Sequence, residues 1–158
     1  MLKEVDVNFI NDLVLVDIES EHQNQKELNY SKKDFIQKLQ KRFSEGYEKF
    51  YAYFESNEII GYASVKPFFP GHKHCELYWM AVRKSHQGKG IGSKILTQLE
   101  NIYKNEGFRK ICLYTGKNME KTRKFYEKNG YTFINEFPDY YGYEKGETTA
   151  VLYYKKLK

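Results

Sequence analysis

The sequence contains few of the residues that mark secreted, metal-binding or membrane-spanning proteins. Its 158 residues include two cysteines and three prolines, and no apolar run approaches the roughly 20 residues of a membrane-spanning helix. Cys75 and Cys112 each lie inside a strand-like run and outside any metal-ligand spacing, so we expect both to be buried, reduced thiols. The first ten residues include acids and lack an apolar secretory core. These absences favour a soluble, cytoplasmic protein.

The composition predicts a globular chain of one domain, residues 1–158. Aromatic residues make up 17% of the sequence and charged residues 30%, which excludes a typical disordered segment. The formal net charge of +5 fits an acidic ligand, a nucleic acid or merely solvated faces. Lysines are scattered through the chain, and one basic cluster, Arg83, Lys84, Lys89 and Lys94, brackets a glycine-rich loop. We therefore expect no nucleic-acid partner and no membrane partner.

The hydrophobic pattern predicts alternating strands and helices. Strand-like runs cover residues 2–7, 50–55, 58–66, 75–82, 111–114, 131–137 and 148–154. Helical patterns cover residues 13–18, 31–43, 91–103 and 118–129. Ser31 and Asp34 have the spacing of an N-terminal cap, Asn118 is a candidate cap, and Gly107 and Gly130 fit helix ends. This order predicts an α/β (α+β) fold with a mixed, mostly antiparallel sheet of about seven strands, a central parallel pair and helices on both faces.

The glycine-rich loop at residues 86–92 joins a strand to a helix. Glycines accept positive φ angles, so the chain can turn sharply and direct its N–H groups inward. The helix that follows adds the positive end of its dipole. Such a loop is suited to a pyrophosphate, and Lys89 and Lys94 would add positive charge.

Two other phosphate-binding loops do not fit this spacing. A Walker A loop ends in Gly-Lys-Ser or Gly-Lys-Thr, whereas Gly92 is followed by Ser93 and Lys94. In the dinucleotide fingerprint, the third glycine would fall at Ser93. A glycine-rich turn that binds nothing remains an alternative at this point.

Two segments resemble the GNAT superfamily of N-acetyltransferases. The run Gln-Gly-Lys-Gly-Ile-Gly at residues 87–92 is similar to the superfamily's acyl-CoA loop, Q/R-x-x-G-x-G/A. Residues 122–131 resemble its A-x-x-F-Y-x-K-x-G-F signature, with Thr122 in place of the alanine. The resemblance covers residues 75–133 and implies an N-acetyltransferase that uses acetyl-CoA. It also implies that the strand at residues 76–82 splays from its parallel neighbour at a bulge near residues 79–81.

The resemblance also implies a set of cofactor contacts. Coenzyme A would contact Met80, Ala81, Val82, Gln87, Gly88, Lys89, Gly90, Ile91, Gly92, Ser93, Asn118 and Tyr126. In this set, backbone groups of Met80 and Val82 would pair with the pantetheine arm, and the amides of residues 87–93 would hold the pyrophosphate. The family's asparagine position falls on Met119 here, so Asn118 would reach the cofactor only if the helix start were shifted.

Transfer of an acetyl group to an amine needs a base for the amine and an acid for the leaving thiolate. The resemblance places Tyr126 beside the sulfur of coenzyme A, where a phenol with a pKa of about 10 can donate a proton. Glu76 matches the base of histone-type members, six residues before Val82. His72 and His74 are weaker candidates for the base, and His86 is more typical of a loop surface residue than of a catalyst. No metal site is expected, because the His-Lys-His run at residues 72–74 lacks partner ligands at suitable spacing.

The segment at residues 138–147 resembles the acceptor-binding segment of peptide Nα-acetyltransferases, including the ribosomal-protein type. Tyr140 and Tyr141 match the tyrosines that hold the peptide backbone in those enzymes. The acceptor is then the N-terminus or a lysine of a peptide or protein, or a small amine. The alternative is a non-catalytic acyl-CoA sensor, which would keep the loop but not need Tyr126 or Glu76. We expect a monomer or a homodimer.

Overall fold

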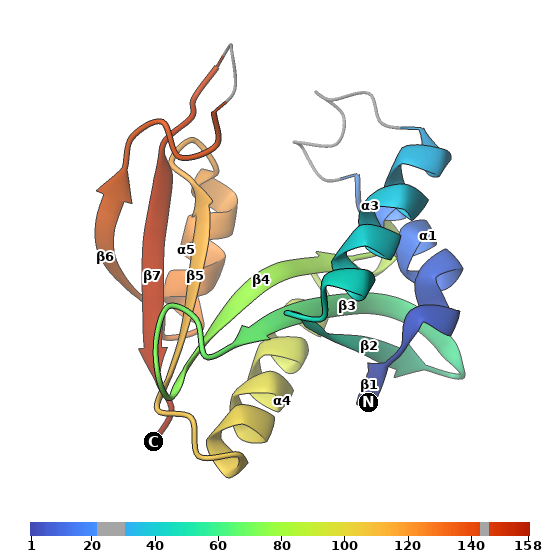
Figure 1. The fold of residues 1–158 in the computed structure, drawn as a ribbon, viewed down its shortest axis with the longest axis horizontal. Coiled ribbons are helices and arrows are strands. Elements are labelled where there is room, and N and C mark those ends of the chain that lie inside the picture. The colour runs from blue at the N-terminus through green and yellow to red at the C-terminus, as the bar shows by residue number, and fades with distance from the viewer. Residues whose placement is uncertain (22–30, 143–145) are drawn as a thin grey trace. The chain divides into compact units, whose positions relative to one another are not determined.

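The computed structural model describes residues 1–21, 31–142 and 146–158. It contains one mixed sheet of seven strands with the order β1-β2-β3-β4-β5-β7-β6 (Figure 1). The strands are β1 (Leu2–Val5), β2 (Lys49–Glu55), β3 (Glu58–Pro67), β4 (His74–Val82), β5 (Lys110–Gly116), β6 (Thr132–Phe137) and β7 (Ala150–Lys156). The α-helices of the described residues are α1 (Ile10–Ser20), α3 (Lys32–Glu45), α4 (Ile91–Asn105) and α5 (Glu120–Lys128). The predicted fold class is confirmed, including the parallel pair, which is β4 with β5.

The chain divides into two compact units. The first comprises Met1–Pro67 and Trp79–Leu99, and the second comprises Phe68–Tyr78 and Glu100–Lys158. Strand β4 contributes residues to both units, and the assignment of residues 1–158 to a single domain stays a prediction. None of the helices in the described ranges has the length and hydropathy that crossing a membrane requires.

In the first unit, helices cover both faces of the strands β1, β2 and β3. Helix α1 contributes the fully buried Leu13, Val14 and Val16 to a core with Phe50 and Tyr62. Helix α3 packs against α1 in the same core (Figure 1). Because side chains alternate along a strand, residues next to Tyr62 face the other side of the sheet, where α4 packs. In this unit, α1 and α3 therefore cover one face of the strands and α4 covers the other, as predicted.

Gly61 allows α4 and β4 to approach β3 closely. A Cβ atom at this position would lie 3.1 Å from the Ala81 carbonyl oxygen and 3.1 Å from the Ile95 Cδ1. Both distances are shorter than ordinary van der Waals contact. A side chain here would therefore force the Ala81 backbone or the Ile95 side chain to shift by a few tenths of an ångström, so glycine is favoured by space rather than by backbone conformation.

Helix α3 begins as the sequence predicts. The Ser31 hydroxyl accepts a hydrogen bond from the Asp34 amide at 3.2 Å, and the Ser31 amide donates to the Asp34 carboxylate at 2.7 Å. This reciprocal pair is a capping box, which satisfies two N–H groups that the first turn leaves unpaired. The helix extends two residues beyond the predicted end, to Glu45, and Gly46 ends it with φ 70°.

A buried ion pair joins the end of α3 to the start of β2. The Arg42 Nη2 lies 2.5 Å from the Glu48 Oε2 and donates to the Ser64 hydroxyl at 2.7 Å. Both side chains of the ion pair are nearly inaccessible to solvent. Because water hardly reaches either side chain, the Glu48 carboxylate compensates the Arg42 charge, and water could not take its place if the carboxylate were removed.

We expect Glu48→Ala to lower the free energy of unfolding by about 3–5 kcal/mol, because it leaves the Arg42 charge buried and unpaired. Urea unfolding followed by circular dichroism measures this loss. Glu45→Ala is the matched control, since the Lys41–Glu45 pair is 3.9 Å long and exposed; it should change the same quantity by less than about 0.5 kcal/mol. Equal losses in the two variants would contradict the proposed role of the buried pair.

The second unit is built on β5, β7 and β6, with α5 beside them (Figure 1). Strand β7 pairs antiparallel with both neighbours, and the parallel ladder of β4 with β5 joins His74–Glu76 to Lys110–Cys112. Cys75 and Cys112 are buried and free, as predicted. Burial raises the pKa of the Cys112 thiol to about 12, so this thiol stays protonated and unreactive.

Several element boundaries differ from the predicted ones. Strand β1 ends at Val5 instead of residue 7, because residues Val7–Phe9 form a 3-10 turn capped by the Asp6 carboxylate. Strand β7 begins at Ala150 instead of residue 148 and continues to Lys156. Helix α5 begins at Glu120, and Met119 rather than Asn118 occupies the N-cap position. The predicted cap at Asn118 was therefore wrong.

Candidate active site

The glycine loop lies in the first unit, between the end of β4 and the start of α4. Gly88 has φ 74° and Gly90 has φ 79°, conformations that L side chains rarely adopt. A Cβ atom at either glycine would meet nothing within 4 Å. These glycines are therefore required by the turn of the backbone, and the space beside them is open.

The start of α4 presents unpaired N–H groups to this space. The first helical hydrogen bond runs from the Lys94 amide to the Gly90 carbonyl at 3.0 Å, so the preceding amides have no partner within the helix. Among the described residues, no side chain caps the amides of Ile91, Gly92 or Ser93. The helix dipole adds a partial positive charge at the same point. This arrangement is suited to a phosphate or diphosphate.

The Gln87 side chain holds the loop in place. Its Nε2 donates to the Val82 carbonyl at 2.8 Å and to the Ser20 carbonyl at 2.9 Å. The amide thereby joins the last residue of β4 to the last residue of α1. Gln87 acts through its side chain as part of the framework, and its backbone N–H donates to the Lys84 carbonyl at 3.2 Å, so the amides open to a ligand begin at Gly88.

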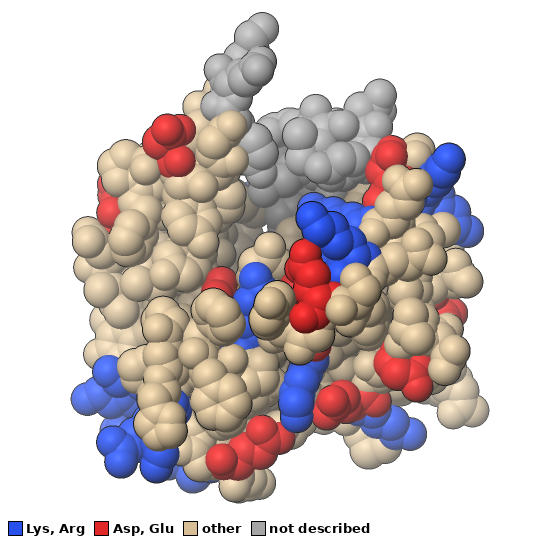
Figure 2. Space-filling model, in the orientation of Figure 1, with Lys and Arg blue, Asp and Glu red and all other residues tan. Residues whose placement is uncertain are grey.

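Half of the predicted basic cluster is neutralised within the protein. Arg83 pairs with Glu58, and Lys84 pairs with Glu21 at 3.1 Å. Lys89 and Lys94 are exposed, and neither forms an ion pair within the described ranges. On the face shown in Figure 2, acidic and basic side chains of the first unit are interspersed rather than gathered by sign. Lys89 and Lys94 are thus the two charges of the cluster suited to an anionic ligand.

Strand β4 leaves β5 before it reaches the predicted pantetheine-binding residues. Within the second unit, the parallel ladder ends at the pair of Glu76 and Cys112, although β4 itself continues to Val82. Ala81 is buried, whereas Met80 and Val82 are half-buried. The end of the ladder fits a splayed strand, and the bulge near residues 79–81 stays a prediction.

Tyr126 lies on α5 in the second unit. The side chain is 8% exposed and contacts the rings of Phe125 and Tyr131, with centroid distances of 5.2 and 5.6 Å. Burial raises the pKa of Tyr126 above its ordinary value of 10. No hydrogen bond ties its hydroxyl to another residue in the described part of the chain. The phenol is therefore protonated at neutral pH and able to donate.

The turn before α5 places Asn118 on the surface. Asn118 is exposed, and its Oδ1 would lie 2.9 Å from a Cβ atom added at Gly116. Met119 follows at the N-cap position, where its sulfur accepts a weak hydrogen bond from the Thr115 hydroxyl at 3.7 Å. Asn118 thus stabilises neither the helix start nor its first N–H groups, and its contact with coenzyme A stays a prediction.

Glu76 lies among tyrosines of the second unit. Side-chain alternation places Glu76 and Tyr78 on one face of β4, and Tyr114 lies two residues after Cys112, the β5 partner of Glu76. Tyr114 stacks on Tyr140 with 5.0 Å between ring centroids and an interplanar angle of 12°. After burial, the Glu76 charge is a main cause of the raised pKa of Tyr140. The carboxylate and the two stacked rings therefore form one cluster.

Tyr114 is the member of this cluster that the sequence does not reveal. It lies in an apolar strand run, where a tyrosine is read as part of the core. Tyr140, 48% exposed, and Tyr141 are adjacent rings in contact at 5.1 Å. The Tyr141 amide donates to the Thr148 carbonyl at 3.1 Å, and residues 143–145 lie outside the described ranges.

The three histidines within the described ranges show no arrangement typical of a catalytic base. His72 is exposed and His74 half-buried on the turn into β4. His86 Nδ1 lies 2.9 Å from the Ser85 hydroxyl, and Nε2 lies 3.8 Å from the Glu55 carboxylate. Among the described residues, no three His, Cys, Asp or Glu side chains are grouped so that they could hold a metal ion.

The second unit also contains a groove with a different set of lining residues. Its volume is about 570 Å³, and the Glu100–Lys155 ion pair of 2.7 Å lies in its wall together with Lys104 and Lys158. None of the predicted site residues lines it. We therefore do not assign the active site to this groove, in spite of its volume.

Comparison with known proteins identifies the family. A model of the acetyltransferase (GNAT) family matches residues 15–131. The uncharacterised N-acetyltransferase YsnE of Bacillus subtilis is 28% identical over 93 residues, which span 58% of this chain and 60% of YsnE. The matched part is thus less than two thirds of that relative.

Two further proteins are similar over more of their length. N-alpha-acetyltransferase 30 of Schizosaccharomyces pombe is 29% identical over 124 residues, covering 69% of this chain and 83% of its own. The PaiA N-acetyltransferase of Thermoplasma acidophilum, solved in complex with coenzyme A, has a TM-score of 0.70 at 20% identity and covers 99% and 98% of the two chains. Because the identity is only 20%, the similarity to the PaiA structure shows a shared fold and nothing further.

Proposed function

Because the chain belongs to the acetyltransferase (GNAT) family, we propose that it transfers the acetyl group of acetyl-CoA to a primary amine. The observation that supports this most strongly is the loop after β4. Gly88 and Gly90 take positive φ angles, and the first turn of α4 offers unpaired amides beside open space. A diphosphate is the group that such a loop is built to hold.

The cofactor would be held along β4 and at the loop. We assign the pyrophosphate to the backbone amides of residues 88–93, with Lys89 and Lys94 adding charge. Backbone groups of Met80 and Val82 pair with the pantetheine arm, and Ala81 between them packs into the core. The solved structure of a family neighbour with coenzyme A supports this class of ligand.

Two side chains would handle the protons of the reaction. When bound, acetyl-CoA supplies the thioester carbon, to which the amine nitrogen forms a bond as the bond from carbon to sulfur breaks. Glu76 accepts the proton that the amine loses, directly or through a water. Tyr126 donates its proton to the thiolate, for which its raised pKa keeps the phenol protonated. General acid and base catalysis of this kind contributes about 10²–10⁴-fold each.

We assign the acceptor to the cluster of Glu76, Tyr114 and Tyr140. Stacked tyrosine rings attract a cation through their faces, and a carboxylate beside them strengthens this attraction. The amine therefore arrives as an ammonium ion and loses two protons in the reaction: Glu76 accepts the first and returns it to solvent, and the second, lost as the bond from nitrogen to carbon forms, replaces the proton that Tyr126 gives to the thiolate. The relative named as an N-alpha-acetyltransferase favours a peptide N-terminus, and Tyr140 and Tyr141 would then contact the peptide.

The experiment that tests the activity is release of free thiol from acetyl-CoA in the presence of amines. The panel contains N-terminal peptides, lysine peptides, polyamines and aminoglycosides. We expect turnover with at least one member, greatest for N-terminal peptides. Tight coenzyme A binding without turnover on any amine would favour the alternative, a non-catalytic acyl-CoA sensor.

Tyr114→Leu should raise the KM of a cationic acceptor about tenfold and leave kcat nearly unchanged, because it removes one ring of the stacked pair. Steady-state kinetics at saturating acetyl-CoA measures both constants. Tyr114→Phe keeps the ring and should restore the KM. Phe133→Leu, which removes another exposed aromatic ring of the second unit, is the control. An unchanged KM in Tyr114→Leu would show that Tyr114 does not contribute to acceptor binding.

A further inference from the structure

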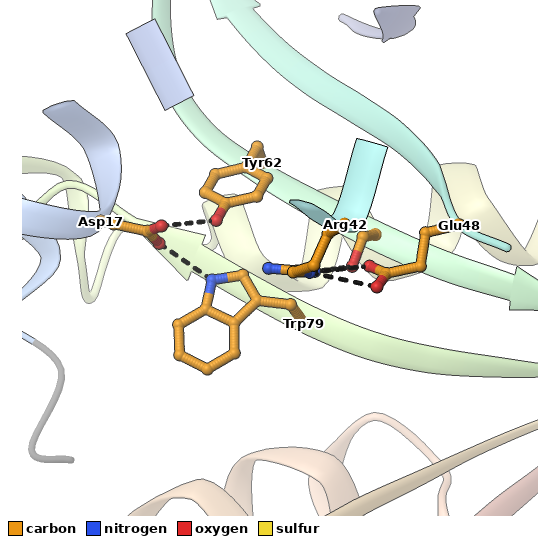
Figure 3. A network of polar contacts seen from close by, with 6 residues as sticks. Asp17, Arg42, Glu48, Tyr62 and Trp79 are labelled. Atoms are coloured by element: carbon orange, nitrogen blue, oxygen red, sulfur yellow. Dashed lines mark hydrogen bonds and ion pairs between the residues drawn. The ribbon is translucent and has the colours of Figure 1, made fainter. Parts of the chain in front are cut away.

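A buried carboxylate joins three elements of the first unit. Asp17 on α1 is 4% exposed. Its Oδ2 accepts a hydrogen bond from the Tyr62 hydroxyl of β3 at 2.7 Å, and its Oδ1 accepts one from the Trp79 Nε1 of β4 at 2.9 Å (Figure 3). These hydrogen bonds cross 45 and 62 residues of sequence. Asp17 therefore ties α1 to both β3 and β4.

The charges around Asp17 come from α3. Arg42 and Lys38 both lower the pKa of Asp17, although Arg42 is held at 2.5 Å by Glu48 (Figure 3). Burial acts more strongly in the opposite direction, and the pKa of Asp17 is raised to about 6. A cavity of about 20 Å³ adjoins Asp17, Lys38 and Trp79, which is room for about one water molecule. The carboxyl group therefore titrates in a range that solution experiments reach easily.

The last turn of α1 holds both ends of the segment that we assign to the cofactor. Asp17 holds Trp79, directly before Met80, through the indole N–H. One turn later, the Ser20 carbonyl accepts from the Gln87 side chain, which also bonds the Val82 carbonyl. Both anchors come from α1, although neither of its residues belongs to the glycine loop or to β4.

We propose that Asp17 is a positioning residue for coenzyme A: its carboxylate fixes Trp79, and through it the backbone of residues 80–82, so that ionised Asp17 favours binding of the cofactor. This inference rests on the proposed function, which assigns that backbone to the pantetheine arm. The inference adds to the proposed function a residue on α1, and it makes the affinity for coenzyme A depend on the charge of one buried group.

The hydrogen-bond chemistry gives the direction of the effect. An ionised carboxylate only accepts, which matches the two donors that face it. On protonation, the Tyr62 hydroxyl can reverse its role and accept, whereas the Trp79 N–H can only donate. The bond to Trp79 then becomes a neutral one, roughly half as strong. Affinity for coenzyme A should therefore fall as the pH falls through the pKa of Asp17.

Trp79 provides a direct readout, because it is the one tryptophan of the chain. Its fluorescence reports the indole bonded to Asp17, with no contribution from another tryptophan. We expect the emission of the wild type to titrate with a midpoint at about pH 6, the pKa of Asp17, and the emission of Asp17→Asn to lose that transition. An unchanged transition in Asp17→Asn would show that Asp17 does not act on Trp79.

The affinity test compares the Kd of coenzyme A in Asp17→Asn and in the wild type, by calorimetry from about pH 5 to about pH 8. The variant also serves as the reference for the ligand, whose phosphate titrates in the same range. We expect the ratio of the two Kd values to be about fivefold at the upper end and to approach one at the lower end. A ratio that does not change with pH would overturn the proposal.

Tyr62→Phe is the matched control. It removes the other hydrogen bond to the same buried carboxylate but leaves Trp79 and β4 untouched. Because the Tyr62 hydrogen bond lowers the pKa of Asp17, this variant should move the fluorescence midpoint upward. At the upper end of the pH range, its Kd should stay within about twofold of the wild type. If Tyr62→Phe lost as much affinity for coenzyme A as Asp17→Asn does, Asp17 would have a purely structural role.

The same measurements separate this inference from the proposed function. If the wild type binds no coenzyme A at any pH, the proposed function fails and the positioning role fails with it. If the wild type binds coenzyme A and the ratio stays flat, only the positioning role fails. The double variant Asp17→Asn/Trp79→Phe should bind no more weakly than Trp79→Phe, since both changes remove one interaction.

Discussion

Gly90→Asp is expected to weaken coenzyme A binding at least about 100-fold, because a carboxylate would face the diphosphate where the loop now offers N–H groups and open space. The aspartate would also adopt a backbone conformation with φ 79°, which is unfavourable for a side chain. Calorimetric titration with coenzyme A measures the loss of affinity.

Gly46→Asp separates the backbone effect from the charge effect. Gly46 ends α3 with φ 70°, and a Cβ atom there also meets nothing within 4 Å. This variant therefore carries the same backbone strain and the same new charge at a distant turn. It should lose stability like Gly90→Asp while keeping its affinity for coenzyme A. Normal binding by Gly90→Asp would contradict the role of the loop.

Tyr126→Phe is expected to lower kcat by about 10²-fold or more and to change the Kd of coenzyme A by less than about threefold. The variant keeps the buried ring and its contacts with Phe125 and Tyr131, and it removes only the proton that the thiolate would take. Since burial raises the pKa of Tyr126 above 10, its deprotonation should not limit the rate near neutral pH.

Tyr131→Phe is the control for loss of a buried hydroxyl. Tyr131 contacts the Tyr126 ring and donates to the Glu100 carboxylate at 3.2 Å, so its loss tests whether any change in this packing slows the reaction. We expect kcat to stay within about threefold of the wild type. Equal losses of kcat in the two variants would remove Tyr126 as the specific acid.

Local patterns in the sequence predicted the elements that local physics determines. The capping box at Ser31 and Asp34 depends on residues three positions apart, and both side chains adopt the expected hydrogen bonds. The positive φ angles of Gly88 and Gly90 follow from a turn between a strand and a helix. Burial of Cys112 follows from its place in an apolar run. These features need no knowledge of distant partners.

Features that depend on distant partners were not predictable in this way. Asp17 lies on the apolar side of α1, among Leu13, Val14 and Val16, and an acid in such a position is a signal of a buried polar contact. The sequence does not show that Tyr62 and Trp79 are its partners. Likewise, Tyr114 stands in an apolar strand, and only the tertiary structure shows its ring stacked on Tyr140.

The predicted start of α5 was wrong for a different physical reason. An asparagine is among the preferred N-cap residues, which favoured Asn118. In the structure, the Met119 amide donates to the Gly116 carbonyl at 3.0 Å, and the Arg123 amide donates to the Met119 carbonyl at 2.9 Å. A tight turn after β5 therefore delays the helix beyond Asn118, and backbone hydrogen bonds replace the expected side-chain cap.

The most direct test of the account is a titration of the ¹⁵N-labelled protein with coenzyme A, followed through its backbone amide signals. The account predicts that the largest shifts fall on the amides of residues 88–93, and that analogues that lack the diphosphate do not reproduce them. Saturable binding with unshifted signals in this loop, and with the largest shifts elsewhere, would contradict it.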